Sequence, residues 1–209
     1  MLPKTILAFD TSAAHCAAAL LLPDGRRLIR QEDMAKGQAE RLLPLLAEVL
    51  AEAGIGWHDL AAVGVGTGPG NFTGVRISVA AARGLALSLA IPAIGVTRLE
   101  ALAHELPRPL TVVEDARRDE VYVQHFGEDG PGLAQLMPLA GLAVFFPVTG
   151  SAAAGLDLPL LMPSMPMVEA IARIAARRMD SPQPRPAPFY LRGADAAPPS
   201  DPPPVILDA

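Results

Sequence analysis

Short apolar runs separated by turn residues predict that the chain opens on a strand and a hairpin. Residues 5–9 form an apolar run that ends in Asp10, as expected of a buried strand. Residues 17–22 form a second apolar run, and the turn Pro23-Asp24-Gly25 follows it. Residues 26–31 are therefore expected to return beside that run as the other arm of the hairpin.

Helical and strand-like spacing then alternate. Leucine and valine recur at helical intervals across residues 38–53, which predicts a helix. Pro44 lacks an N–H group, so the regular helix is expected to start close to it, and Gly54 is expected to end it. Residues 61–66 are typical of a buried strand, and the apolar stretch 72–89 predicts a long helix.

A short strand at residues 91–95 and a brief helix, capped near Thr97 and running through His104, complete this part of the chain. The order of elements predicts an α/β lobe with a mixed sheet. Pro107 and Pro109 mark the end of that lobe.

The remaining pattern predicts a smaller lobe and a tail. An amphipathic helix is expected at residues 167–179, and the dense prolines from Ser181 to Pro204 indicate an extended surface segment anchored by Phe189-Tyr190-Leu191. We therefore divide the chain into an N-terminal lobe, a second lobe and a proline-rich tail. The ranges are 1–106, 107–192 and 193–209. The strand candidates of the second lobe are residues 110–113, 121–126 and 143–148.

Composition and charge restrict the setting. Hydrophobic residues make up 51% of the 209 residues and aromatic residues only 4%, so the interior is built from aliphatic side chains. One cysteine suits a reducing compartment. No signal peptide is indicated, because the first ten residues lack a long apolar region. No membrane span is indicated, because Arg76 and Arg83 interrupt the apolar stretches. The expected location is the cytoplasm, without membrane contact.

The charge argues against strong nucleic-acid binding by this chain alone. The formal net charge is −5, and lysine occurs only at Lys4 and Lys36. Nucleic-acid backbones are bound through clustered lysine and arginine. If the protein acts on a nucleic acid, another subunit is expected to supply most of the contacts.

The segment with the clearest chemistry is the turn Gly66-Thr-Gly-Pro-Gly-Asn-Phe-Thr-Gly-Val-Arg76. Backbone N–H groups at the start of a helix can hold an anion. However, Asn71 stands where a dinucleotide fingerprint needs its third glycine, and no lysine follows as in a Walker loop. A structural turn is therefore favoured, with a phosphate site as the alternative, and no catalytic machinery is expected in the turn.

Small residues recur every four positions along the helix that follows the turn. They are Gly74, Ser78, Ala82, Ala86 and Ala90. This spacing places a nearly bare stripe on one helix face, which lets another element approach closely. The stripe is either an internal seam against the protein's own sheet or a subunit interface.

Catalytic patterns are largely missing. The histidines lack the spacing of a helical metal pair, and neither Cys-x-x-Cys nor Gly-x-Ser-x-Gly occurs. Cys16 follows His15, but adjacency does not align a thiol with a base, so a buried structural cysteine is favoured. Asp10 is either a functional carboxylate or a turn residue. We expect neither a metal nor a cofactor.

Several segments in order resemble the TsaB (YeaZ) family, once labelled glycoprotease-like. The specific element is Gly68-Pro-Gly-Asn-Phe-Thr-Gly-Val-Arg76, within the turn described above. The other matching segments are Ile6-Leu-Ala-Phe-Asp-Thr-Ser12, Gln38-Ala-Glu-Arg-Leu-Leu-Pro44, Asp115-Ala-Arg-Arg-Asp-Glu-Val-Tyr122 and Phe189-Tyr-Leu-Arg192.

The resemblance implies an actin/Hsp70/sugar-kinase type of fold with mixed sheets, related to the ribonuclease H-like fold. It implies a non-catalytic scaffold that pairs with TsaD, the subunit that places threonylcarbamoyl on adenosine 37 of tRNAs reading ANN codons, with the ATPase TsaE joining them. A homodimer is also compatible, and tRNA is contacted mainly through the complex. The implied interface comes from the first two long helices. Its residues are Glu40, Leu43, Phe72, Gly74, Val75, Ser78, Ala82 and Ala86.

Departures from related ATPases argue against independent activity. TsaD-like proteins hold a metal through His-x-x-x-His, which is lacking here. Actin-type ATPases have Asp-x-Gly at the first strand turn, whereas this chain has Asp10, Thr11 and Ser12, a possible vestigial phosphate loop. Gln38 stands where the family commonly has a histidine. The alternative function is an independent, metal-free hydrolase or ATPase.

Overall fold

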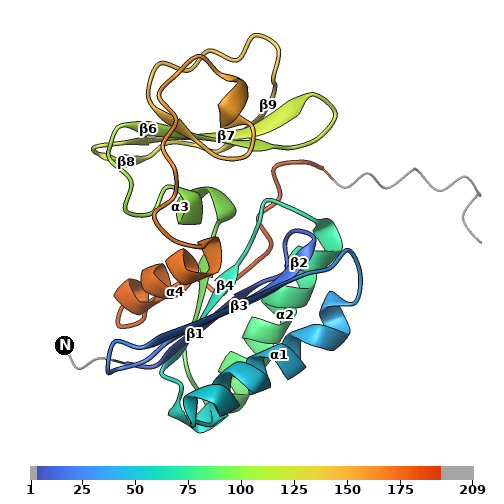
Figure 1. The fold of residues 1–209 in the computed structure, drawn as a ribbon, viewed down its shortest axis with the longest axis vertical. Coiled ribbons are helices and arrows are strands. Elements are labelled where there is room, and N and C mark those ends of the chain that lie inside the picture. The colour runs from blue at the N-terminus through green and yellow to red at the C-terminus, as the bar shows by residue number, and fades with distance from the viewer. Residues whose placement is uncertain (1–3, 194–209) are drawn as a thin grey trace, which may run out of the picture.

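The computed structural model describes residues 4–193, which form two mixed β-sheets with helices packed on the first (Figure 1). The first sheet has the strand order β3-β2-β1-β4-β5, in which β1, β2 and β3 are antiparallel and β4 and β5 run parallel to β1. Its strands are β1 (Ile6–Asp10), β2 (His15–Leu21), β3 (Arg27–Asp33), β4 (Ala62–Gly66) and β5 (Ala93–Val96). This arrangement confirms the predicted ribonuclease H-like, actin-type α/β fold.

Alternation along β1 explains how the first sheet acquires two cores. Leu7 and Phe9 belong to the core under α1 (Gln38–Ala53) and α2 (Phe72–Leu89). Ile6 and Ala8 belong to the core under α4 (Met167–Arg178). Successive side chains of a strand point to opposite faces, so one strand supplies both cores. Figure 1 shows α1 and α2 on one side of the sheet and α4 on the other.

The predicted ends of the first long helix are only half correct. Gly54 ends α1 in the left-handed conformation, with φ of 75°, as expected. The helix begins at Gln38, however, and Pro44 lies inside it. The expectation that the regular helix starts near Pro44 is therefore wrong. Pro44 is exposed, so the helix tolerates its missing N–H on the solvent side.

The predicted cap at Thr97 is confirmed. Its side-chain oxygen accepts a hydrogen bond of 3.1 Å from the N–H of Glu100 at the start of α3 (Arg98–Leu102). The helix ends at Leu102 rather than at His104, where the chain turns toward the second sheet.

The second sheet has the order β10-β6-β7-β8, and β9 pairs with β7. Its strands are β6 (Leu110–Asp115), β7 (Glu120–Gly127), β8 (Gly130–Pro131), β9 (Gln135–Pro138) and β10 (Val148–Thr149). The predicted strand at residues 143–148 is wrong except for its last residue. Phe145 is 83% exposed and Pro147 has no N–H to donate, so pairing begins only at Val148.

Helix α4 lies in the sequence range predicted for the second lobe but packs on β1, β2 and β4 of the first sheet. Gly64 of β4 makes this possible, since a Cβ added there would lie 3.0 Å from Cβ of Ala175. The division at residue 106 falls between α3 and β6 and remains a proposal, to which we add that α4 belongs with the first sheet. The tail proposed from residue 193 lies almost wholly outside the described residues.

By length and composition alone, α2 is the one helix among residues 4–193 that would suffice to cross a membrane. Such a helix is weak evidence, because core helices meet the same test. Val75, Val79 and Ala82 of α2 are buried in the core of the first sheet. The sequence predicted no membrane span, and the one helix that passes the length and composition test packs on the first sheet.

Candidate functional site

The turn after β1 lies beneath the glycine-rich turn. Asp10, Thr11 and Ser12 are 1%, 0% and 2% exposed. The hydroxyl of Thr11 donates to the carbonyl oxygen of Gly74 over 2.6 Å, and the N–H of Asn71 donates to the carbonyl oxygen of Ser12 over 2.6 Å. The first strand and the start of α2 are therefore locked together through backbone groups.

The glycines permit this close approach. A Cβ on Gly66 would lie 1.9 Å from Oδ1 of Asp10, and one on Gly74 would lie 1.9 Å from the carbonyl oxygen of Thr11. Real Cβ atoms do not approach other atoms so closely, so a larger residue would displace the Asp10 side chain at position 66 and the Thr11 backbone at position 74. The glycine pattern thus has a structural cause: it makes room for the end of β1.

The anion-binding groups at the start of α2 are already engaged. Oδ1 of Asn71 accepts hydrogen bonds of 3.0 Å from the N–H groups of both Thr73 and Gly74. These are the donors that a phosphate at a helix N-terminus would use. The structural-turn interpretation of the glycine-rich segment is therefore favoured over a phosphate site.

Asp10 is bound on several sides by its own neighbours. Its Oδ2 accepts from the N–H of Ser12 over 3.1 Å and from the hydroxyl of Ser12 over 2.9 Å. Nε2 of His15 lies 2.8 Å from the same oxygen. The role of Asp10 to Ser12 as a vestigial phosphate loop stays a prediction, and in this structure their polar groups organise the turn.

The adjacent cysteine is not placed as a nucleophile. The His15 ring is directed to Asp10, and Cys16 is fully buried in the core under α1 and α2. Burial is the main cause that raises the pKa of the Cys16 thiol to about 11, with Glu32 adding to it. A nucleophilic cysteine needs a lowered pKa, so Cys16 is a structural residue, as predicted.

The small-residue stripe of α2 faces the protein's own sheet. Gly74, Val75, Ser78 and Ala82 are all buried. The hydroxyl of Ser78 lies 3.2 Å from the carbonyl oxygen of Gly66 at the end of β4. At Gly74, Ser78 and Ala82 the stripe is internal, and the prediction that these residues and Val75 contact a partner directly is corrected. The last two stripe residues differ, since Ala86 is partly buried and Ala90 is exposed. The four-residue spacing of small side chains showed that this helix face carries no large side chains, but it did not show which element packs against it.

Other members of the predicted interface do lie on the surface. Leu43 is 48% exposed and Phe72 is 41% exposed, while Glu40 is exposed and Ala86 is partly buried. Leu87, which the sequence did not single out, is 79% exposed near the end of α2. We refer to these residues of the two helices, Glu40, Leu43, Phe72, Ala86 and Leu87, collectively as the α1–α2 surface; Ala86 and Leu87 line a second cleft together with Pro186.

A C-terminal strap, residues 186–192, joins the two sheets. The N–H of Phe189 donates to the carbonyl oxygen of Thr67 over 2.8 Å. At its far end, Arg192 donates to the carbonyl oxygen of Ala116 and pairs with Glu120. The predicted anchoring of this segment around Phe189 is thus confirmed.

The strap also contacts α2 and β5. Nε of Arg76 donates to the Tyr190 hydroxyl over 2.9 Å, and its guanidinium carbon lies 3.6 Å from the centre of the Phe72 ring. Nε of Arg83 donates to the carbonyl oxygen of Pro186 over 2.6 Å. Pro186 also lies against Gly95 of β5.

The matching turn of the second sheet is strained. Arg117, Arg118 and Asp119 have φ values of 62°, 57° and 56°, although none is glycine. Oδ1 of Asp115 accepts from the N–H of Arg117 over 2.9 Å, and Oγ of Ser151 accepts from the N–H of Asp115 over 2.9 Å. These bonds hold the left-handed run between β6 and β7.

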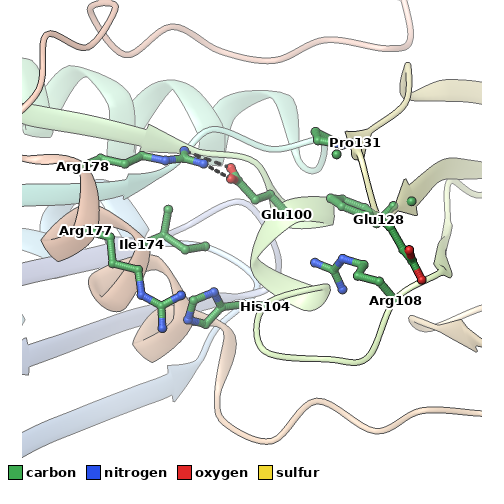
Figure 2. A pocket seen from close by; sticks show the side chains of 11 residues that line it. Glu100, His104, Arg108, Glu128, Pro131, Ile174, Arg177 and Arg178 are labelled. Carbon is green, nitrogen blue, oxygen red and sulfur yellow. Dashed lines mark hydrogen bonds and ion pairs between the residues drawn. The ribbon is translucent and has the colours of Figure 1, made fainter.

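A cleft of about 380 Å³ opens between α3, α4 and the β7–β8 hairpin (Figure 2). Its charged lining residues come from elements far apart in the sequence, and no motif predicted it. They are Glu100, His104, Arg108, Glu128, Arg177 and Arg178. Among residues 4–193, no group of three or more His, Cys, Asp or Glu side chains is placed to hold a metal ion.

Comparison with known proteins adds an independent line of evidence. A family model described as TsaD, tRNA N6-adenosine threonylcarbamoyltransferase, matches residues 29–144. The solved structure of YeaZ from Pseudomonas aeruginosa superposes with a TM-score of 0.73 at 31% identity and covers 90% of this chain and 100% of its own. The chain belongs to the TsaB/YeaZ family.

Two curated TsaB proteins are similar over part of their length. The tRNA threonylcarbamoyladenosine biosynthesis protein TsaB of Haemophilus influenzae is 40% identical over 123 residues, which are 56% of this chain and 52% of that protein. The protein of the same name from Escherichia coli is 37% identical over 134 residues, 61% of this chain and 57% of that protein. The match thus spans little more than half of these TsaB relatives.

Replacing Gly74 by alanine tests the contact between α2 and the β1 turn. We expect Gly74→Ala to lower the free energy of unfolding by about 2 kcal/mol or more, because its Cβ would meet the Thr11 carbonyl. Gly84→Ala in the same helix is the matched control, since nothing lies within 4 Å of its Cβ. The control should gain up to about 1 kcal/mol from helix propensity. Equal effects in urea unfolding would contradict the assigned contact.

The state of Cys16 is tested by thiol labelling. A pKa of about 11 instead of 9.0 leaves roughly a hundredfold less thiolate near neutral pH, and burial blocks access as well. We expect Ellman's reagent to leave the folded protein unlabelled over the time in which the protein in urea reacts fully. Rapid labelling of the folded protein would show an accessible thiol and reopen a nucleophilic role.

Proposed function

We propose that this protein is the non-catalytic subunit that pairs with a TsaD-like catalytic subunit in threonylcarbamoylation of adenosine 37 in tRNAs reading ANN codons. Its curated relatives are named for threonylcarbamoyladenosine biosynthesis, which supports a place in that pathway. A TsaE-like ATPase joins the pair, and tRNA is contacted mainly through the complex. The site of action is the cytoplasm.

The observation that carries the pairing is the α1–α2 surface. Leu43, Phe72 and Leu87 leave large apolar area in water on helices whose other faces are already buried. Apolar area of this kind gains free energy when a partner covers it. The match of the chain to the TsaD family model supports a partner of similar fold, and two related lobes can pair through equivalent helices.

The same surface accounts for a homodimer when the partner is missing. An isologous contact between two copies would use Leu43 and Phe72 from each chain. The two assemblies would then compete, because each covers the same apolar side chains.

Substitution on the α1–α2 surface should separate association from folding. We expect Leu43→Asp to weaken binding to the TsaD-like subunit at least about tenfold, because a charge would be buried in the contact. Leu133→Asp is the matched control, since that leucine is 88% exposed in the loop between β8 and β9. Calorimetry measures affinity, and circular dichroism checks the fold. Equal loss in both variants would place the contact elsewhere.

Drop-out reconstitution tests the role itself. Purified TsaD, TsaE, threonylcarbamoyl-AMP synthase, ATP and tRNA are incubated with and without this protein. We expect modified tRNA only in its presence, and Leu43→Asp should reduce the yield more than Leu133→Asp. Product formed equally well without the protein would refute the proposal. Hydrolysis of ATP by the isolated chain would favour the independent hydrolase instead.

A further inference from the structure

The cleft between α3, α4 and the β7–β8 hairpin has a polar lining that the proposed function does not use. His104 and Arg108 reach it from the segment after α3, and Arg177 from the end of α4. Phe126 of β7 closes one side and Ile174 of α4 another. Figure 2 shows the Arg177 side chain beside the His104 ring, with Arg108 across the end of α3 in this view.

The charges in the cleft are only partly paired. Arg178 and Glu100 bind each other, as the dashed lines in Figure 2 show, and Arg177 lies 2.7 Å from Glu105. Arg108 has no such carboxylate partner among residues 4–193. Its Nη1 donates to the carbonyl oxygen of Leu106, and its guanidinium lies 5.2 Å from the Phe126 ring centre. Burial lowers the pKa of Arg108, which nevertheless remains charged.

His104 contributes an unsatisfied buried nitrogen. Its side chain is only 7% exposed, and within the described chain Nε2 has no hydrogen-bond partner. The nearest carboxylate oxygen, from Glu105, is 3.6 Å away, too far for a hydrogen bond. Buried polar atoms are almost always paired, so this nitrogen marks a position where an acceptor is expected.

The surroundings of His104 are cationic on balance. Burial is the main cause that lowers its pKa from the ordinary value, and Arg177 and Arg173 lower it further. Glu105 and Glu100 raise the pKa of His104, each by less than Arg177 lowers it. Glu128 also lines the cleft, from the turn of the hairpin. An anion placed among these groups would offset the arginines.

We propose that this cleft binds the phosphate group of a small molecule, held by Arg108, Arg177 and Nε2 of His104. A phosphate group has three terminal oxygens and can accept from all three side chains at once, whereas a carboxylate has only two. The guanidinium fork matches this geometry. The cleft volume of about 380 Å³ lies within the range of small-ligand sites.

The site would connect the two sheets. Arg177 belongs to α4, which packs on the first sheet, while Phe126 and the hairpin belong to the second. A bound phosphate group would therefore bridge these two parts of the chain. This inference does not rest on the proposed pairing with a TsaD-like subunit.

The first experiment measures binding of inorganic phosphate to the full chain by calorimetry. We expect saturable binding that Arg108→Gln and Arg177→Gln each weaken about tenfold or more. Arg26→Gln is the control, because Arg26 lies in the β2–β3 turn, away from the residues that line the cleft, and forms an ion pair with Asp24. Acetate should bind much more weakly than phosphate. No saturable binding, equal binding by acetate, or binding unchanged in both cleft variants would overturn the proposal.

The second experiment reads the site directly at His104. Sulfate serves as a non-titrating analogue in an NMR pH titration of the imidazole. Because a nearby anion favours imidazolium, we expect sulfate to raise the pKa of His104 toward or above its ordinary value. The shift should vanish in Arg108→Gln and persist in Arg26→Gln. An unchanged His104 titration at saturating sulfate would contradict the assigned contact.

Two further arms identify the source of the phosphate. Glycerol 3-phosphate represents a small phosphomonoester, and tRNA represents an RNA backbone. Binding of glycerol 3-phosphate that depends on Arg108 supports the small-molecule ligand. If only tRNA binding depends on Arg108, the small-molecule assignment is overturned in favour of RNA. Both binding measurements use the isolated chain, so a failure of the phosphate site can be told apart from a failure of the proposed function in the reconstitution.

Discussion

The structure depends on the contact between the end of β1 and the start of α2. The Thr11 hydroxyl donates to the Gly74 carbonyl, the Ser12 carbonyl accepts from the Asn71 N–H, and the glycines of the turn leave no side chain in the way. That contact sets how closely α2 lies on the sheet, and therefore which of its residues face inward. Thr67, whose carbonyl oxygen accepts from the N–H of Phe189 in the strap, is itself held by Val96 of β5.

Local patterns were sufficient for most of the first sheet. The apolar run of β1, the leucine spacing of α1 and the cap at Thr97 each depend on neighbours within a few residues, and each was predicted. The small-residue stripe of α2 shows where such inference stops. The four-residue spacing identifies a helix face without large side chains, and such a face can pack against a sheet of the same chain or against a helix of a partner. Only the position of Ser78 against Gly66 decides between them.

Long-range features were not predictable. The cleft assembles His104, Phe126 and Arg177 from segments separated by many residues, and no local spacing joins them. Arg177 taken alone is a charge on the polar face of an amphipathic helix. Strand β9 is short and half-buried, so its pairing with β7 is decided by tertiary context rather than by propensity. Glu40, Leu43, Phe72 and Ala86 of the α1–α2 surface were predicted through the family resemblance, whereas Leu87 was recognised only from its exposure in the structure.

The strap has a further consequence for how the first sheet ends. Among residues 4–193, β5 is an edge strand whose strand partner is β4. An uncovered edge is a template for pairing with strands of other molecules, and proline is a residue that blocks such growth. Pro186 lies against Gly95 of that strand, inside a segment with prolines at alternate positions, Pro182, Pro184, Pro186 and Pro188. Prolines at this position are therefore expected to hinder the addition of a strand from another molecule to the edge of the sheet.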